Sequence, residues 1–537
     1  MRAFFNKYWK IGVSLIFFSL IYLFWWRCYP HALSYQEQYQ LFLWTCDYLV
    51  KSLSVPGGLA AWMGEGIVQF YYIPWIGALM LAVVFVVLQR LTARLLDPAR
   101  RQWYLLSFVP SLLLLWMMGD ESVLLSYGVA LCLTLTAVLL RPRLFSWRGL
   151  LADVVLIPVL YWTVGPVAGI YVVLRVVRSG WKSLWTLLYL LLLIMVAYHW
   201  LLPQWSLASV ITGIVYYRIP ETGCAMMWIL PVVIVLLAVM PSRINNRLVW
   251  AAQVLVLAVL ACLSLTQGFD REKYELICQD YLVRNERWDD IIDRASEYQV
   301  KTPFSSVCVN LALSQRRQLA DRQFDFWQSG PDALIMPRQR DLTSMLPSAE
   351  TFWRLGMVNS SQRYMFDTQE SILNAHKSGR CTQRIVECML VNGHYQPARK
   401  QIDLLKKSLF YRKWAKEAET YLGHEDKINA HPVWGKIRQF RYKDDFLFSY
   451  PELDKMFYIL FSTNPENKMA LDYMLAQMLL NGNVPAFMQY LQLAQQYGGY
   501  STMPLVYQDV VQCARNGGGN DSSPYMNFFK QMRQGQQ

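Results

Sequence analysis

Residues 27–75 read RCYPHALSYQEQYQLFLWTCDYLVKSLSVPGGLAAWMGEGIVQFYYIPW and lie between the first two long apolar runs of the chain. The stretch is rich in aromatic and polar side chains and contains Glu37, Asp47 and Glu65. It has no apolar run long enough to cross a bilayer, whereas the apolar runs on either side of it are long enough. The pattern predicts a membrane protein whose first span is followed by a long loop. We expect part of any chemistry to lie in that loop.

The composition supports the membrane assignment. The 537 residues are 54% hydrophobic and only 17% charged, which is too apolar for an ordinary soluble protein. Residues 1–268 hold 18 Lys and Arg against 8 Asp and Glu, while the remainder holds 33 against 30. Most of the net charge of +13 therefore belongs to the membrane half, where basic residues orient the spans. We expect no nucleic-acid partner.

About nine apolar segments are long enough, or nearly so, to cross a hydrocarbon core of about 30 Å at 1.5 Å per helical residue. They are residues 11–26, 71–89, 103–119, 122–140, two short segments within 149–177, 184–202, 226–240 and 248–267. Residues 149–177 carry basic groups at both ends and a Gly165-Pro166 break in the middle. A hairpin returns both ends to one side of the membrane, so we prefer it to a single helix.

The basic residues between the spans predict the orientation. With the N-terminus in the cytoplasm, fifteen Lys and Arg face the cytoplasm and three, Arg27, Lys51 and Arg218, face the other side. The first run ends without a small-residue cleavage site, so we expect an uncleaved signal anchor. An odd number of spans then places the residues after 267 in the periplasm. The chain is predicted to be a multi-pass protein of a bacterial inner membrane, in contact with the lipid bilayer.

The second half is predicted to be α-helical, because apolar residues recur at helical spacing from residue 269 onward. In segments 283–295, 390–398 and 480–486, a helix ends at a small polar turn, and a second helix begins with an aromatic or apolar residue followed by Ala. Residues 311–324 and 355–366 are weaker examples. The pattern resembles the tetratricopeptide repeat (TPR), although the spacing departs from a strict period of about 34 residues.

The predicted fold class is therefore all-α. A polytopic transmembrane helix bundle of about nine spans occupies residues 1–268, a TPR-like α-helical solenoid occupies residues 269–515, and a flexible tail occupies residues 516–537. Plain helix pairs without repeat ancestry are the alternative for the second half.

The polar residues that are candidates for catalysis or binding lie in the outer loops, which are residues 27–70, 119–122 and 203–225. These are Glu37, Asp47, Glu65, Asp120, Glu121, Arg218 and Glu221, with His199 nearby. Acidic residues at the edge of an apolar run are costly unless they face water or a partner, which favours a function for Asp120-Glu121. The structural alternative is that they cap the helix that begins near Ser122.

This arrangement resembles the membrane module of the GT-C class of glycosyltransferases, which use polyprenyl-phosphate-linked sugars. The resemblance implies Glu37, Asp120 and Glu121 as catalytic residues, and Arg218, with His199 and Glu65, as substrate-binding residues. A carboxylate near the interface would deprotonate an acceptor hydroxyl, and Arg218 would neutralise the leaving phosphate. The class usually has Asp in the first loop, often within an acidic pair, whereas Glu37 is flanked by glutamines. That departure argues against a divalent metal.

We expect neither a zinc site nor a disulfide framework, because the ten cysteines show no Cys-x-x-Cys pair and no His/Cys cluster at metal spacing. No cofactor is predicted, and a divalent metal stays open as the alternative. Cys381 and Cys388 are seven residues apart, which predicts one helical face, and two buried thiols explain them best. Asp153 and His199 are expected near opposite membrane faces, which gives little support to a proton or ion pathway.

The whole chain also resembles a family of Bacteroidota inner-membrane proteins that pair about nine spans with a TPR-like C-terminal half. That resemblance rests on topology and on residues 37–42, EQYQLF, and implies no activity. Two functions stay open: a GT-C-like glycosyltransferase that acts on a polyprenyl-phosphate-linked sugar, and a non-catalytic scaffold. A transporter is a third, less favoured alternative. In the first, the TPR-like half holds a glycan or protein acceptor; in the second, it binds a periplasmic protein.

Overall fold

The computed structural model describes residues 2–96, 98–140, 147–218, 224–240, 247–339, 341, 343–372, 376–443, 449–497, 500–516 and 523–535. Within these residues every element is helical, apart from one isolated antiparallel bridge between Val123 and Arg218. The predicted all-α class is confirmed. Contacts divide the chain into unit 1, Met1–Arg271, and unit 2, Glu272–Gln537.

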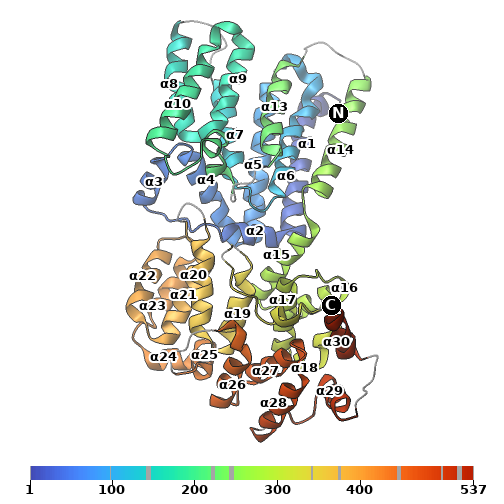
Figure 1. Cartoon of the computed structure of the whole chain (residues 1–537). Helices are drawn as coiled ribbons and strands as arrows, with labels where there is room; N and C mark the ends of the chain where they lie inside the picture. The colour runs from blue at the N-terminus through green and yellow to red at the C-terminus, as the bar shows by residue number, and fades with distance from the viewer. Residues whose placement is uncertain are drawn as a thin grey trace. The chain divides into compact units, whose positions relative to one another are not determined.

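Unit 1 is a bundle of long apolar helices joined by short ones. Its helices are α1 (Arg2–Leu23), α2 (Pro30–Glu37), α3 (Cys46–Leu53), α4 (Gly58–Val68), α5 (Pro74–Leu95), α6 (Val109–Met118), α7 (Ser126–Leu140), α8 (Trp147–Val164), α9 (Ala168–Ser179), α10 (Trp185–Trp200), α11 (Leu207–Thr212), α12 (Ile214–Tyr217), α13 (Met226–Val239) and α14 (Arg247–Gln267). Pro30 and Pro74 stand in the first turns of α2 and α5, where a missing N–H costs nothing. Figure 1 shows α2, α3 and α4 together at one end of the long helices and the N-terminus at the other.

Three helices of unit 1, α1, α6 and α14, run parallel with matched ends. At the N-terminal end of α1, the Tyr104 hydroxyl donates to the Lys10 carbonyl at 2.9 Å, and the Trp9 ring lies 6.0 Å from that of Trp250 at the start of α14. At the other end, a Cβ on Gly119 would lie 2.1 Å from the Gly268 carbonyl oxygen, so α6 and α14 touch through glycine backbones. The loop of residues 27–75 lies at this second end.

Five helices of the described residues are long and apolar enough to cross a membrane. They are Tyr8–Cys28, Pro74–Leu95, Gly149–Ser179, Trp181–Trp200 and Leu248–Gln267. Three shorter apolar helices, Gln102–Met118, Ser126–Leu140 and Met226–Val239, fall below that length. At 1.5 Å per residue they reach roughly 20 to 26 Å, less than a hydrocarbon core of about 30 Å. The structure therefore shows five candidate spans where the sequence predicts about nine.

The segment Gly149–Ser179 folds back on itself. Arg175 Nε donates to Asp153 Oδ2 at 2.9 Å and the Tyr171 hydroxyl donates to Oδ1 at 2.6 Å. A straight helix would hold residues 153 and 175 roughly 33 Å apart. The chain turns at Gly165, whose φ of +68° suits glycine, and the predicted hairpin of α8 and α9 is confirmed.

Unit 2 consists of shorter helices packed in consecutive pairs. They are α15 (Arg271–Arg284), α16 (Trp288–Glu297), α17 (Pro303–Gln315), α18 (Leu319–Arg322), α19 (Met345–Leu355), α20 (Val358–Glu370), α21 (Gly379–Asn392), α22 (Tyr395–Leu405), α23 (Arg412–Glu419), α24 (Glu425–Ala430), α25 (Trp434–Phe440), α26 (Leu453–Thr463), α27 (Lys468–Leu480), α28 (Val484–Gln496), α29 (Leu505–Asn516) and α30 (Pro524–Gly535). Cys381 and Cys388, both in α21, are buried free thiols.

Five helix pairs of unit 2 share one kind of turn. A residue with positive φ ends the first helix of each pair, and these residues are Glu286, Arg317, Gly356, Gly393 and Gly482. In each turn the amide of the residue after the positive-φ residue donates to the carbonyl five positions earlier, as from His394 N to Met389 O at 2.8 Å. This is the Schellman motif, which satisfies the last carbonyls of a helix. All five turns fall in the segments that the sequence singled out as helix pairs.

Part of the tail that we expected to be flexible is a packed helix. The Ser523 hydroxyl accepts from the Met526 amide at 3.3 Å and caps α30. The rings of Tyr525 and Phe528 each lie 5.1 Å from that of Phe324. The aromatic face of this short amphipathic stretch is sufficient to dock it on unit 2.

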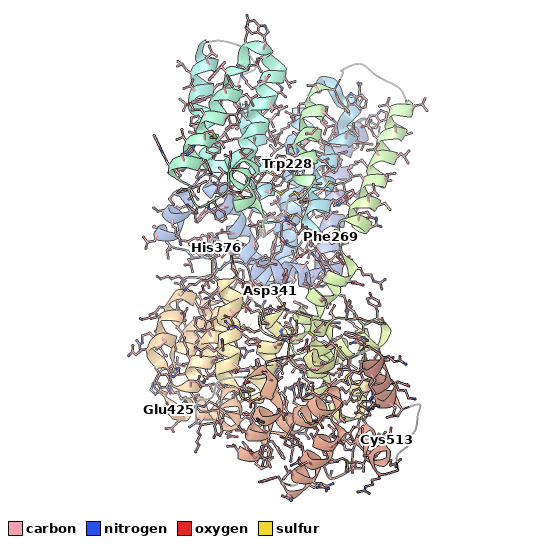
Figure 2. All side chains as sticks on the ribbon, viewed as in Figure 1. Trp228, Phe269, Asp341, His376, Glu425 and Cys513 are labelled. Carbon is pink, nitrogen blue, oxygen red and sulfur yellow. The ribbon has the colours of Figure 1, made fainter. Side chains whose placement is uncertain are left out.

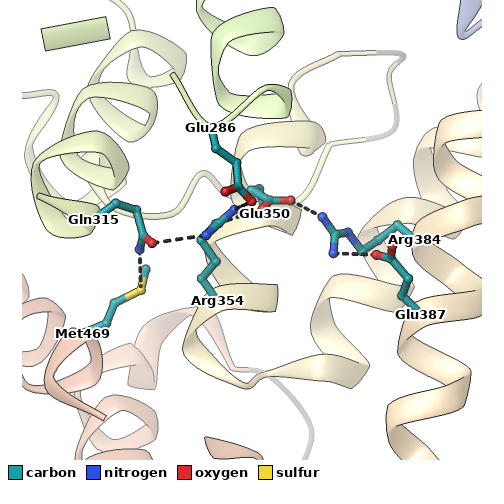
Figure 3. A network of polar contacts seen from close by, with 7 residues as sticks. All are labelled: Glu286, Gln315, Glu350, Arg354, Arg384, Glu387 and Met469. Carbon is teal, nitrogen blue, oxygen red and sulfur yellow. Dashed lines mark hydrogen bonds and ion pairs between the residues drawn. The ribbon is translucent and has the colours of Figure 1, made fainter. Parts of the chain in front are cut away.

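A buried carboxylate joins several helix pairs of unit 2 (Figure 3). Glu350 in α19 accepts from Arg354 at 2.9 Å and from Arg384 of α21 at 2.6 Å. Arg354 also reaches Glu286 at 2.7 Å, and Arg384 reaches Glu387 at 2.7 Å. Since Glu350 is buried and both of its partners are charged, it ties α19 to α21, and Arg354 extends the network to the turn after α15.

Candidate functional site

Two of the predicted outer loops are joined through main-chain contacts. Residues 119–122 follow α6, and the Leu124 amide just beyond them donates to the Tyr217 carbonyl at 2.8 Å. The isolated bridge between Val123 and Arg218 extends this pairing by one residue. The segments on either side of the bridge therefore hold residues 120 and 218 close together.

Asp120 uses both carboxylate oxygens within this structure. Its Oδ2 forms an ion pair with Arg218 Nη2, and its Oδ1 accepts from the Ser122 amide at 3.0 Å. The Arg218 side chain is 8% exposed and that of Asp120 26% exposed. The helix predicted to begin near Ser122 begins instead at Ser126, so Asp120 closes a turn before α7 rather than capping it, and its other oxygen pairs with Arg218.

The first loop reaches the same place. The Gln36 side-chain amide donates to the Val123 carbonyl at 3.4 Å. The pKa of Tyr39 is held well above its usual value, first by burial, then by Tyr35, and further by the negative charges of Glu121 and Asp120. Glu37 lies between these two residues in the chain, at the end of α2, and is buried. The structure thus brings the segment that carries Glu37 beside the Asp120-Glu121 turn.

The remaining predicted residues occupy different positions. Glu65 in α4 accepts a hydrogen bond from the Tyr48 hydroxyl, and burial followed by this carboxylate raises the pKa of Tyr48. The Gln40 side-chain amide donates to the main-chain carbonyl of Glu65 at 3.5 Å, so the contacts of Glu65 lie within the first loop. His199 is exposed at the end of α10 with its ring against Tyr198, and no contact in the described residues joins it to Arg218. Glu221 lies outside the described residues.

The space beside these residues is small. A cavity of about 20 Å³ is lined by residues of the first loop, among them Gln36 and Glu65, by Ser126 at the start of α7, and by Tyr216. That volume holds a water molecule and excludes a sugar. No group of three or more His, Cys, Asp or Glu within the described ranges is placed to hold a metal ion.

A much larger groove lies beside Tyr127, whose ring contacts that of Tyr217. Its volume is about 590 Å³ and its lining comes mainly from α9, α11 and α13. We call it the α9–α13 groove. Trp228, labelled in Figure 2, and Val232 and Leu236 line it and are each more than half exposed. The groove is therefore open to the surroundings of the bundle along α13.

A polar strip is present in this otherwise apolar groove. Ser206, Ser209 and Thr212 are spaced three residues apart on one face of α11, and all three line the groove. The Ser206 hydroxyl caps α11 by accepting from the Ser209 amide at 3.2 Å. The groove thus offers a long apolar wall and a short row of hydroxyl groups.

Tyr127 links the groove to the acidic site. Its hydroxyl donates to the Met227 carbonyl at 2.8 Å, which fixes α7 against the start of α13. Its ring contacts that of Tyr217, at 5.3 Å between centroids, and Tyr217 directly precedes Arg218. The Tyr127–Tyr217 contact therefore connects the groove to the segment that carries the Asp120–Arg218 ion pair.

Sequence reasoning missed the groove because its lining is scattered over four helices with ordinary apolar composition. The one available signal was the row of hydroxyl residues at 206, 209 and 212 inside the predicted outer loop 203–225. Hydroxyl groups at helical spacing within a loop indicate a short helix with one polar face, and that face lines the groove.

Comparisons with known proteins identify the family without an activity. No curated protein and no solved structure matches the chain. A family model described as a family of unknown function, DUF6057, matches residues 7–534. Because that match covers nearly the whole length, the chain belongs to the DUF6057 family.

Proposed function

We propose that this protein is an integral membrane enzyme that acts on a lipid-linked sugar, in the manner of a GT-C glycosyltransferase. The observation that carries the proposal is the α9–α13 groove, which adjoins the buried Arg218 through the Tyr127–Tyr217 contact. A membrane groove that binds a hydrocarbon chain beside a buried cation suits a lipid phosphate.

The lining of the groove favours a lipid chain as its occupant. Val232 and Leu236 line it and are also part of the exposed apolar surface of α13. Side chains of this kind face hydrocarbon in a bilayer, so a groove continuous with them fills with hydrocarbon rather than water. The hydroxyls on α11 suit the more polar end of the same molecule.

The proposed reaction uses the residues at the bridge. A carboxylate, Glu37 or Asp120, takes the proton of an acceptor hydroxyl as the new glycosidic bond forms. The bond between the sugar and the lipid phosphate breaks, and the phosphate leaves with the lipid while Arg218 neutralises its charge. Because the adjoining cavity of about 20 Å³ excludes a sugar, the first loop must move to admit the substrate.

The topology is part of the proposal. Nine membrane segments result if the α8–α9 hairpin supplies two and the three shorter apolar helices each supply one. The excess of basic residues at one end of the bundle supports a cytoplasmic N-terminus, and the odd number places unit 2 in the periplasm. The five similar helix pairs support a TPR-like superhelix that holds the acceptor or a periplasmic protein.

Paired variants in a deletion strain test the catalytic proposal. We expect Asp120→Asn and Glu37→Gln each to lower the amount of glycosylated product by about a hundredfold or more, the usual effect of losing a general base. Asp47→Asn, an exposed acid in the same outer region, should retain full activity. Lipid-linked saccharides and surface glycans are measured by mass spectrometry, with protein amounts matched. Unchanged saccharides in the deletion strain would exclude the proposal.

A non-catalytic scaffold is the second candidate, and one observation favours it. Both oxygens of Asp120 are occupied by Arg218 and the Ser122 amide, which is what a purely structural turn requires. For a scaffold, Glu37→Gln would leave all glycans unchanged, whereas loss of unit 2 would disrupt an envelope assembly.

A further inference from the structure

A polar cleft in unit 2 lies where two of the helix-pair turns meet. It has a volume of about 270 Å³ and is lined by the Gly356–Ser360 turn, by Asn392 and His394 of the next turn, and by residues 441–443. No carboxylate is among the described residues that line it. The nearby Glu425 is already held by Arg438 and the Tyr395 hydroxyl.

The first side of the cleft supplies hydrogen-bond donors. Helix α20 begins at Val358 after Gly356, whose φ is +86°, and no side chain caps its first turn. The first helical bond runs from the Ser361 amide to the Met357 carbonyl, so the amides of Val358 and Ser360 lie in the first turn, ahead of the helical hydrogen bonds. Such amides attract negative charge.

Ser360 provides an independent indication of a ligand. The residue is only 8% exposed, yet it lines the cleft. Its hydroxyl makes no hydrogen bond to any other residue in the described part of the chain. A hydroxyl that lines a cleft and has no partner in the described residues is available to a bound group.

The opposite side of the cleft is cationic. Arg441 Nη1 donates to Asn392 Oδ1 at 2.7 Å, and the Asn392 amide donates in turn to Asn359 Oδ1 at 2.7 Å. This chain of hydrogen bonds fixes the guanidinium at the rim. Lys443 is exposed, lines the cleft, and forms no ion pair with the described residues.

We propose that this cleft binds an oxyanion group, phosphate or carboxylate, of a small ligand. Its oxygens accept from the α20 amides and from Ser360, and its charge is neutralised by Arg441 and Lys443. The volume exceeds that of a bare anion, so the group belongs to a larger molecule. The proposal concerns unit 2 alone and does not depend on the reaction proposed for unit 1.

Calorimetric titration of the full-length detergent-purified protein tests this site, with inorganic phosphate in one arm and succinate in the other. We expect at least one anion to bind, and Lys443→Gln and Ser360→Ala each to weaken that binding about tenfold. Lys407→Gln, an exposed lysine of the same unit outside the cleft, is the matched control and should bind as wild type does. The preferred arm then distinguishes a phosphate from a carboxylate.

Two results would overturn the proposal: binding of neither anion at millimolar concentration, or equal affinity in Lys443→Gln and Lys407→Gln. Arg441→Gln removes a charge and also the hydrogen bond to Asn392 at the end of α21. Weaker anion binding by this variant therefore supports the proposal only if the thermal unfolding midpoint of the protein is unchanged. The glycan measurements on Asp120 and Glu37 variants are unaffected by either outcome, which keeps the two proposals separate.

Discussion

Asp153→Asn is expected to destabilise unit 1 by about 3–5 kcal/mol, because it leaves the buried charge of Arg175 without its counterion. The Asp153 and Arg175 side chains are 1% and 5% exposed, and Tyr171 donates to the same carboxylate at 2.6 Å. Within a helical hairpin of a membrane protein, no water replaces the lost partner. We expect the thermal unfolding midpoint in detergent to fall by roughly 10 °C, as followed by tryptophan fluorescence.

Two further variants show whether the loss comes from the burial of an unpaired charge. Asp153→Leu combined with Arg175→Met should recover most of the midpoint, since an apolar pair of similar size carries no desolvation cost. Asp289→Asn removes the partner of an exposed arginine, Arg316, and should cost about 1 kcal/mol or less. If Asp153→Asn shifts the midpoint no more than Asp289→Asn does, then α8 and α9 do not form this hairpin.

Glu350→Gln is expected to cost about 3 kcal/mol in unit 2, because it removes the charge shared by Arg354 and Arg384 (Figure 3). The matched control is Glu286→Gln, which removes the other partner of Arg354. The Glu286 side chain is 63% exposed against 9% for Glu350, so water replaces the lost contact and the cost should stay below about 1 kcal/mol. Equal thermal shifts of the two variants would contradict the assigned role of Glu350.

The Glu350 effect should depend on pH in one direction. Burial alone would raise the pKa of this carboxyl, but Arg384 and Arg354 outweigh it and hold the pKa below its usual value of 4.5. A lowered pKa in the folded state means that the stabilisation is present above about pH 4.5 and is lost as the pH falls through the folded pKa. The difference in stability between wild type and Glu350→Gln should therefore be largest near neutral pH and shrink in acid.

The elements that the sequence predicted well are those set by local chemistry. The turns at Gly393 and Gly482 follow from glycine's access to positive φ between two amphipathic segments. The α8–α9 hairpin follows from Gly165-Pro166 and from basic residues at both ends of one apolar run. The approach of the Glu37 segment to Asp120 was expected from a resemblance, and the contacts of Gln36 and Tyr39 place the segment there.

The features that the sequence did not predict depend on packing between distant segments. The apolar run 103–119 was predicted as one span, but α6 begins only at Val109, because residues 98–108 form a 3₁₀ helix. His199 and Arg218 belong to nearby stretches of sequence, but His199 stays exposed on α10 while Arg218 pairs with residue 123. The α9–α13 groove is invisible in sequence for the same reason.

Site-specific photocrosslinking tests most directly the claim that the α9–α13 groove holds a lipid-linked substrate. A photoreactive side chain is placed at Val232 in the groove, and separately at Leu255, an equally exposed apolar position of α14. The proteins are illuminated in vesicles that contain labelled polyprenyl phosphate. The account predicts labelling at 232 that excess unlabelled polyprenyl phosphate suppresses and bulk phospholipid does not, with only weak, unsuppressed labelling at 255. Equal labelling at the two positions, with no suppression, would contradict it.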